Sequence, residues 1–200
     1  MKKLLCVLMA AVFAVIGLAG CSKSDEKETE TESAPTGSNV RVTMQDGGSF
    51  VIELYEQYAP ETCKNFLKLV DEGFYDGLTF HRVIDGFMAQ GGSSDGLGIK
   101  GSDETIKGEF SANGFTQNTL SHTRGVVSMA RANGYDTASS QFFICYDDCS
   151  FLDGDYAAFG KVIDGMEVVD SFLEVERTFD SSGELSSPVE PIVIKTMEIV

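Results

Sequence analysis

The stretch FHRVIDGFMAQGG, Phe80 to Gly92, contains two short apolar segments separated by Asp85 and Gly86, as expected for two strands joined by a turn. One charged side chain, Arg82, lies among residues that are typical of barrel core: Phe80, Val83, Ile84, Phe87 and Met88. Removing a guanidinium from water is costly unless the group is hydrogen-bonded. Arg82 therefore needs an explanation beyond packing.

Short segments of this kind recur along the chain. In SFVIELYE (49–56), Phe50, Ile52 and Leu54 alternate with Val51, Glu53 and Tyr55, as expected for a strand. The Asp-Gly-Gly before this segment predicts a hairpin with NVRVTMQ (39–45). Further segments, apolar or aromatic and bounded by Gly, Asp, Asn or Ser, are LTFHRVI, FMAQGG, GVVSMA, SQFFICY, YAAFGKVI and PIVIKTMEIV. Each of them predicts a strand.

Only two helical patterns accompany these strands. The first starts at Pro60, ends near Gly73 and has an apolar face formed by Cys63, Phe66, Leu67 and Val70. The second is GMEVVDSFLEV, after Gly165. Many strands with two helices favour a mainly β domain, a barrel that is closed or nearly closed, over a parallel sheet with crossover connections. The glycine-rich connection GGSSDGLGIKGSDETIKGEF (91–110) is expected to be a surface loop, where a barrel usually carries its function.

The N-terminus has the order of a secretory signal peptide, with Lys2 and Lys3, an apolar run and small residues before Cys21. LAGC, which ends at Cys21, resembles the lipobox of bacterial lipoproteins. This resemblance implies that residues 1–20 are removed and that Cys21 carries acyl chains such as palmitate. The alternative is an ordinary secretory signal. Both readings place the protein outside the cytoplasm, but only the first ties it to a membrane.

Residues 21–38 are polar and acidic and contain almost nothing apolar, so we expect a disordered, flexible tether. Residues 39–200 have the size of one domain. The chain carries a net charge of −16, which becomes −18 if Lys2 and Lys3 are removed with the signal. Such a charge disfavours nucleic acid and anionic lipid headgroups as partners.

The domain has three cysteines, Cys63, Cys145 and Cys149, and none of their spacings comes with the further ligands of a zinc site. We therefore expect no metal. A disulfide between Cys145 and Cys149 is one alternative in an oxidising compartment, and three small apolar fillers are the other.

Common catalytic motifs are missing: the sequence has no G-x-S-x-G, no H-E-x-x-H and no Walker loop. Large apolar side chains with interspersed amides recur instead: Phe87, Met88, Gln90, Gln141, Phe143, Phe151 and Leu152. This make-up suits a hydrophobic pocket with a few orienting polar groups. The alternative is that each phenylalanine is ordinary core.

FHRVIDGFMAQGG, HTRGVVSMARA, SSQFFI and the segment from FLDG to AFGKVIDGM resemble, in order and spacing, the signature segments of the cyclophilin family of peptidyl-prolyl cis-trans isomerases. The resemblance extends from about Val40 to Val200. It implies an eight-stranded antiparallel barrel capped by two helices, and an enzyme that needs no cofactor.

The resemblance also implies roles for individual residues. Arg82 matches the catalytic arginine. The residues that match substrate-binding positions are Phe87, Met88, Gln90, Gly96, His122, Ala130, Arg131, Ala132, Gln141, Phe143, Phe151, Leu152 and Tyr156. The pair Phe151 and Tyr156 is common in the bacterial branch and implies weak inhibition by cyclosporin.

Asp85 departs from the family, which usually has proline there, and its carboxylate could pair with Arg82 and compete with substrate. The expected function is isomerisation of X-Pro bonds in exported polypeptides by a monomer that is lipid-anchored to the bacterial cell membrane, outside the cytoplasm. The alternative is a non-catalytic proline-peptide binding module or holdase.

Overall fold

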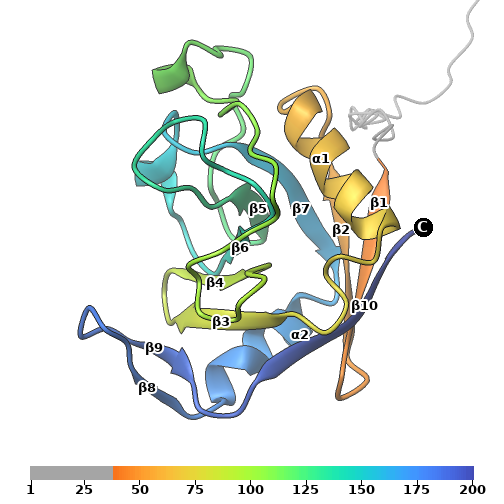
Figure 1. Cartoon of the computed structure of the whole chain (residues 1–200), viewed down its shortest axis with the longest axis vertical. Helices are drawn as coiled ribbons and strands as arrows, with labels where there is room; N and C mark the ends of the chain where they lie inside the picture. The colour runs from red at the N-terminus through yellow and green to blue at the C-terminus, as the bar shows by residue number, and fades with distance from the viewer. Residues whose placement is uncertain (1–37) are drawn as a thin grey trace, which may run out of the picture. The chain divides into compact units, whose positions relative to one another are not determined.

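The computed structural model describes residues 38–200 (Figure 1). The strands are β1 (Asn39–Met44), β2 (Ser49–Leu54), β3 (Thr79–Ile84), β4 (Met88–Gly91), β5 (Val126–Met129), β6 (Phe142–Cys145), β7 (Ala158–Asp164), β8 (Arg177–Phe179), β9 (Leu185–Pro188) and β10 (Ile192–Ile199). The helices are α1 (Pro60–Asp71) and α2 (Met166–Ser171), with the 3-10 turns η1 (Ser111–Asn113), η2 (Ser150–Leu152) and η3 (Phe172–Glu174). The predicted signal peptide, Cys21 and nearly all of the predicted tether lie outside the described residues.

Eight strands form a closed antiparallel barrel in the order β1-β10-β3-β4-β6-β5-β7-β2. The predicted hairpin of β1 and β2 is confirmed, with Val42 opposite Phe50. Asp46 helps to form its turn by accepting a hydrogen bond from the Gly48 amide at 2.9 Å. β10 pairs along the other edge of β1, so the C-terminal strand closes the barrel next to the first strand. The predicted fold class is therefore confirmed.

The predicted first helix is confirmed as α1, which begins at Pro60. Its buried face includes Cys63, Phe66 and Val70 as predicted, but Leu69 is buried and Leu67 lies at the edge of the face. Gly73 follows the helix with φ +66°, the left-handed conformation that glycine adopts most readily. Figure 1 shows α1 and α2 on opposite sides of the barrel strands.

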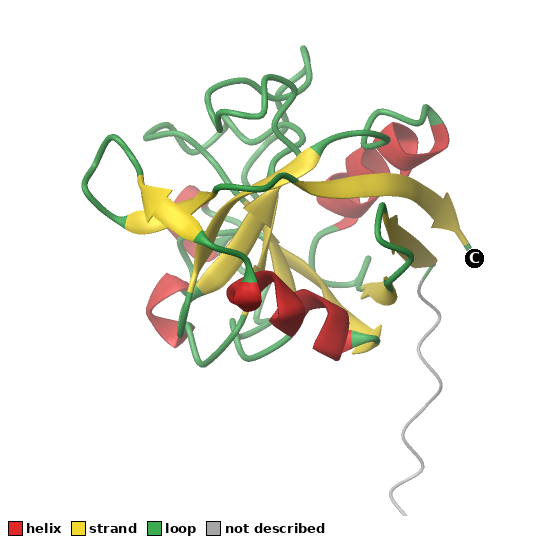
Figure 2. Cartoon of the chain, turned by 90° about the horizontal axis from the view of Figure 1, so that it is seen from below, coloured by secondary structure: helices red, strands yellow, loops and turns green. Residues whose placement is uncertain are grey.

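The second predicted helix is shorter than its pattern. α2 spans Met166–Ser171, and the remaining apolar residues tighten into η3. The chain then forms a β8–β9 hairpin that the sequence analysis did not predict. Figure 2 shows this two-stranded unit beside the barrel, and its strands pair only with each other.

The glycine-rich connection after β4 is a loop, as predicted, apart from one isolated bridge between Ile106 and Ala138. Within residues 38–200, no helix is both long enough and apolar enough to cross a membrane.

Candidate active site

A β-bulge in β3 explains how Arg82 escapes the core. Phe80 pairs with Gly91, but the next pair is Arg82 with Gln90, so β3 has one extra residue at this point. Phe80 and Val83 stay buried, whereas His81 and Arg82 between them are both partly exposed. The Arg82 side chain is 32% exposed. Its charge is therefore at the surface, and the burial problem raised by the sequence does not arise.

Arg82 stands at the rim of a cavity of about 190 Å³. The cavity is lined by Arg82, Phe87, Met88, Gln90, Ala130, Arg131, Phe143, Leu152 and Tyr156. All nine are residues that the sequence predicts for the site. Met88, Phe143 and Leu152 are buried, and they form a small apolar cluster with two cysteines. A cavity with an apolar floor and a cationic rim suits a compact apolar group joined to a polar chain.

The floor of this first cavity is held from behind by Cys145 and Cys149, which are free thiols in the structure. The alternative of a disulfide between them is therefore not the state seen here. Burial raises the pKa of both thiols. Burial, followed by the nearby carboxylates of Glu56 and Glu109, raises the pKa of Cys63 to about 12.

Because thiolates are the reactive form, we expect Cys63, Cys145 and Cys149 to resist alkylation in the native protein. Iodoacetamide labelling at pH 8 followed by peptide mapping would check this. Unfolding without a reductant should make all three thiols reactive. Recovery of a Cys145–Cys149 linked peptide from protein isolated without reductant would contradict the prediction.

A second cavity, also of about 190 Å³, continues from the first, since Gln90, Ala130 and Arg131 line both. Ala132 and Gln141, two further predicted residues, lie on its wall. The Gln90 amide donates a 2.9 Å hydrogen bond to Gln141 Oε1, and the Gln141 amide donates to the Gly98 carbonyl at 3.1 Å. Together the two cavities form one groove, with three lining residues in common.

Arg131 is held mainly by aromatic rings. Its guanidinium carbon lies 4.6 Å from the centroid of Tyr156 and 5.3 Å from those of Phe110 and Tyr135. Its Nε also donates to the Asp155 carbonyl at 3.0 Å. Such cation–π contacts each contribute roughly 0.5–1 kcal/mol at partly exposed sites. They fix the loop wall between the two cavities, a function that the sequence alone did not suggest for Arg131.

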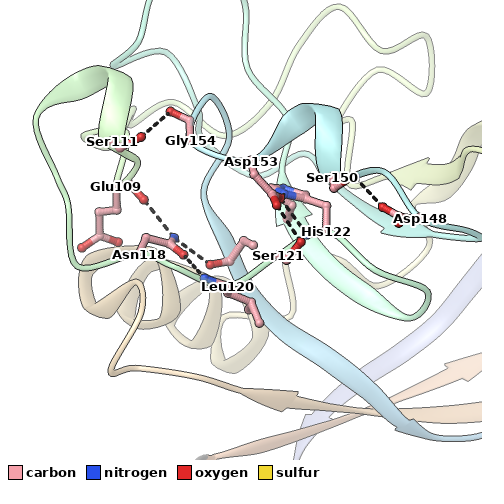
Figure 3. Close-up of polar contacts among 12 residues, drawn as sticks. Glu109, Ser111, Asn118, Leu120, Ser121, His122, Asp148, Ser150, Asp153 and Gly154 are labelled. Carbon is pink, nitrogen blue, oxygen red and sulfur yellow. Dashed lines mark hydrogen bonds and ion pairs between the residues drawn. The ribbon is translucent and has the colours of Figure 1, made fainter.

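His122 does not reach either cavity. It is fully buried, and its ring stacks on Phe143 with centroids 6.0 Å apart. Nδ1 lies 2.7 Å from Asp153 Oδ1 and Nε2 lies 2.9 Å from Ser128 Oγ; Figure 3 shows the imidazole and Asp153 together. His122 thus supports the cavity floor from behind, and Phe143 stands between it and the groove.

The burial of His122 makes the stability of the folded protein depend on pH. Burial lowers the pKa of His122 below its ordinary value of 6.5, and the hydrogen bond to Asp153 opposes this shift only in part. Burial also lowers the pKa of His81. The unfolded chain therefore binds protons more readily than the folded one, so the stability that these groups provide is present above pH 6.5 and is lost as pH falls from there towards the folded-state pKa values.

We expect the melting temperature to fall as the pH is lowered through this window, which thermal unfolding in a series of buffers would measure. His122→Gln should have a shallower slope because the contribution of His122 is removed and that of His81 remains. A slope unchanged in a His81→Gln and His122→Gln double variant would contradict this assignment. Asp153, whose pKa is lowered, acts in a separate and more acidic window.

The other two predicted residues lie beside the cavities. Phe151 is 69% exposed, and its ring centroid is 5.7 Å from that of Phe87, so it extends the apolar rim. Gly96 lies in the loop after β4 and lines a different cavity of about 610 Å³, which it shares with His81 and Pro188.

The hypothesis that Asp85 pairs with Arg82 is wrong. Arg82 Nη2 instead donates a 2.7 Å hydrogen bond to Glu184 Oε2, in the turn of the β8–β9 hairpin. The two residues are 102 positions apart, and nothing in the local pattern of either segment indicated the contact. Asp85 is exposed in the turn between β3 and β4, the position that its residue type favours.

In residues 38–200, no group of three or more His, Cys, Asp or Glu side chains could hold a metal ion. The side chains that the groove offers a ligand are the guanidinium groups of Arg82 and Arg131, the amides of Gln90 and Gln141, and an apolar pocket.

Comparison with known proteins agrees with this geometry. Residues 39–199 match the model of the family described as cyclophilin type peptidyl-prolyl cis-trans isomerase/CLD. Peptidyl-prolyl cis-trans isomerase A of Dickeya dadantii is 38% identical, covering 96% of this chain and 97% of its own length. Peptidyl-prolyl cis-trans isomerase B of Bacillus subtilis is 49% identical over 62% of this chain and 82% of its own.

A crystal structure of a cyclophilin-type isomerase from Cryptosporidium parvum is similar in fold, with a TM-score of 0.70 and 34% sequence identity. It covers 82% of this chain, and 98% of that protein is matched. A second structure of the same protein was determined in the presence of the dipeptide Ala-Pro, and its TM-score is 0.69.

Proposed function

Since the chain belongs to the cyclophilin-type peptidyl-prolyl cis-trans isomerases, we propose that it accelerates rotation about X-Pro bonds in exported polypeptides while they fold outside the cytoplasm. The observation that carries the site assignment is the position of Arg82, at the rim of an apolar cavity and beside a polar groove.

The cavity floor would receive the proline ring. Phe87, Met88, Phe143 and Leu152 supply its apolar contacts. The presence of Ala-Pro with the related Cryptosporidium parvum protein supports this choice of ligand. Gln90 and Gln141, already hydrogen-bonded to each other, are preorganised to orient the neighbouring peptide groups in the second cavity.

Arg82 would then act on the amide itself. Resonance gives the X-Pro bond double-bond character and a rotation barrier of roughly 18–20 kcal/mol. A guanidinium that donates a hydrogen bond to the prolyl nitrogen localises its lone pair and weakens that resonance. The nitrogen accepts this bond best when it is pyramidal, halfway through rotation, so Arg82 stabilises the transition state more than the ground state. No covalent bond or proton transfer is involved.

The export proposal is supported by the N-terminal sequence, where a signal-like segment ends in LAGC at Cys21. We propose that acylated Cys21 anchors the chain to the bacterial cell membrane and that the acidic segment after it holds the domain away from the lipid, as a monomer. The high negative charge supports proteins, and not nucleic acid, as partners.

Two experiments test these proposals separately. A protease-coupled assay on an X-Pro peptide measures isomerisation by the full chain; binding of the peptide without acceleration would favour a binding module or holdase. Mass spectrometry of the membrane fraction should find acyl chains on Cys21, and Cys21→Ala should release the protein from that fraction. A mature chain that begins before Cys21 with a free amine would contradict the anchor.

A further inference from the structure

The ion pair of Arg82 joins the groove to an element that does not belong to the barrel. Glu184 Oε2 accepts a 2.7 Å hydrogen bond from Arg82 Nη2, and the side chains are 40% and 32% exposed. Figures 1 and 2 show the β8–β9 hairpin next to β3, the strand that carries Arg82. A carboxylate from the hairpin is thus bonded directly to the guanidinium that faces the proline cavity.

The turn that carries Glu184 is well ordered by its own hydrogen bonds. The Glu184 amide donates to Asp180 Oδ1 at 3.0 Å, and the Glu184 carbonyl accepts from the Asp180 amide at 2.8 Å. Asp180 also accepts bonds from Ser182 Oγ at 2.6 Å and Ser186 Oγ at 2.9 Å. The backbone of Glu184 is therefore held on both sides, so its carboxylate is presented from a fixed point.

The hairpin is also attached to β3 itself. Arg177, in β8, points a guanidinium nitrogen at the Val83 carbonyl at 3.5 Å, a long contact one residue from Arg82. This contact links β8, the strand that leads to the Glu184 turn, to β3 at the residue next to Arg82. A pair whose two ends are both anchored loses little conformational freedom when it forms.

The other groups near Arg82 do not make this contact redundant. The Gln90 amide is directed to Gln141. The Phe87 ring lies 5.9 Å from the guanidinium carbon, and a cation–π contact of this kind attracts the group without fixing the direction of its N–H bonds. A guanidinium has five N–H donors. Glu184 engages Nη2 and leaves donors on the other nitrogens for a substrate.

We propose that Glu184 is a positioning residue for isomerisation: its carboxylate holds the Arg82 guanidinium at the cavity rim, in the orientation from which it reaches the prolyl nitrogen. This inference rests on the proposed function of Arg82. The contrary possibility, that the carboxylate occupies Arg82 and must be displaced by substrate, predicts the opposite sign for its removal and is an outcome of the same test.

For Glu184→Ala we expect kcat/KM on an X-Pro peptide to fall about fourfold, with KM and the melting temperature nearly unchanged, because the pocket and the hairpin backbone remain. Glu184→Gln keeps an oxygen acceptor without the charge, so its kcat/KM should be about twofold below that of the wild type. The difference in kcat/KM between Glu184→Ala and wild type should shrink in 1 M salt, because the screening length there is only about 3 Å and the ion pair is weakened. Asp85→Asn, which removes a nearby exposed carboxylate, is the matched control and should behave as wild type.

A double variant shows whether Glu184 acts through Arg82. In an Arg82→Ala background, Glu184→Ala should cause no further loss, since there is no guanidinium left to position. A rise in activity for Glu184→Ala would overturn the proposal in favour of competition. An equal further loss in the double variant would overturn it in favour of a structural effect of the hairpin. If Arg82→Ala alone keeps full activity, the proposed function of Arg82 fails first and independently.

Discussion

Arg82→Ala is expected to lower kcat/KM for an X-Pro peptide about 100-fold, or roughly 2.7 kcal/mol of transition-state stabilisation. The reason is that Arg82 is the cation at the rim of the first cavity in a position to meet the prolyl nitrogen, since the side chain of Arg131 is packed on three aromatic rings. The apolar floor is untouched by the substitution. Peptide affinity should therefore fall much less than the rate.

The fold should survive this change. The Arg82 side chain is 32% exposed, and its ion pair with Glu184 is a surface pair of the kind that contributes at most about 1 kcal/mol. The protease-coupled assay measures the rate, and chemical denaturation measures the stability. Arg82→Lys keeps the charge but loses the planar guanidinium with its several N–H donors. Its kcat/KM should therefore lie between those of the wild type and Arg82→Ala.

Arg124→Ala is the matched control for Arg82→Ala. Arg124 is also a surface arginine in an ion pair, with Asp170 at 2.6 Å, but it lines neither cavity of the groove. Its removal should leave kcat/KM unchanged. If Arg82→Ala unfolds the domain, Arg82 is structural. If the variant isomerises as fast as Arg124→Ala, Arg82 does not take part in catalysis and the groove works by another means.

The barrel and the groove differ in how far they can be derived from sequence. Strands such as SFVIELYE and the helix at Pro60 follow local rules, because alternation and helical spacing record which face is buried. The number of strands indicated a closed or nearly closed barrel, but the eight-stranded antiparallel form came from resemblance to a family. The pairing between β1 and β10 joins the two ends of the domain and leaves no local trace in the sequence.

The contacts that complete the site were harder to foresee. β8 has no alternating buried face, so the hairpin that carries Glu184 gave no strand signal. A resemblance to the family predicted His122 as a pocket residue, but sequence does not tell whether a side chain touches the ligand or the residue behind it. In the structure Phe143 lines the cavity, and His122 packs behind Phe143 without reaching the cavity. Long-range polar partners depend on the assembled barrel, not on the segments that form it.

Phe66→Ala should produce the opposite phenotype to Arg82→Ala. Phe66 lies on the buried face of α1 and is fully buried. Its ring centroid is 5.1–5.5 Å from those of Phe159, Tyr75 and Phe142, so it joins the helix to the barrel interior. Truncating a phenylalanine in such a place leaves a cavity and costs about 3–5 kcal/mol.

Denaturant unfolding would measure this loss, with Phe151→Ala as the control: that ring is 69% exposed, so its removal should change the free energy of unfolding by less than about 0.5 kcal/mol. Because Phe66 lines neither cavity of the groove, Phe66→Ala should keep kcat/KM within about twofold of wild type under conditions where it remains folded. A folded Phe66→Ala that had lost isomerase activity would mean that the helix and the groove are coupled through the barrel. Retained activity, set against the stable but slow Arg82→Ala, would mean that the barrel serves as a rigid support and that the rate depends on the side chains at its outer rim.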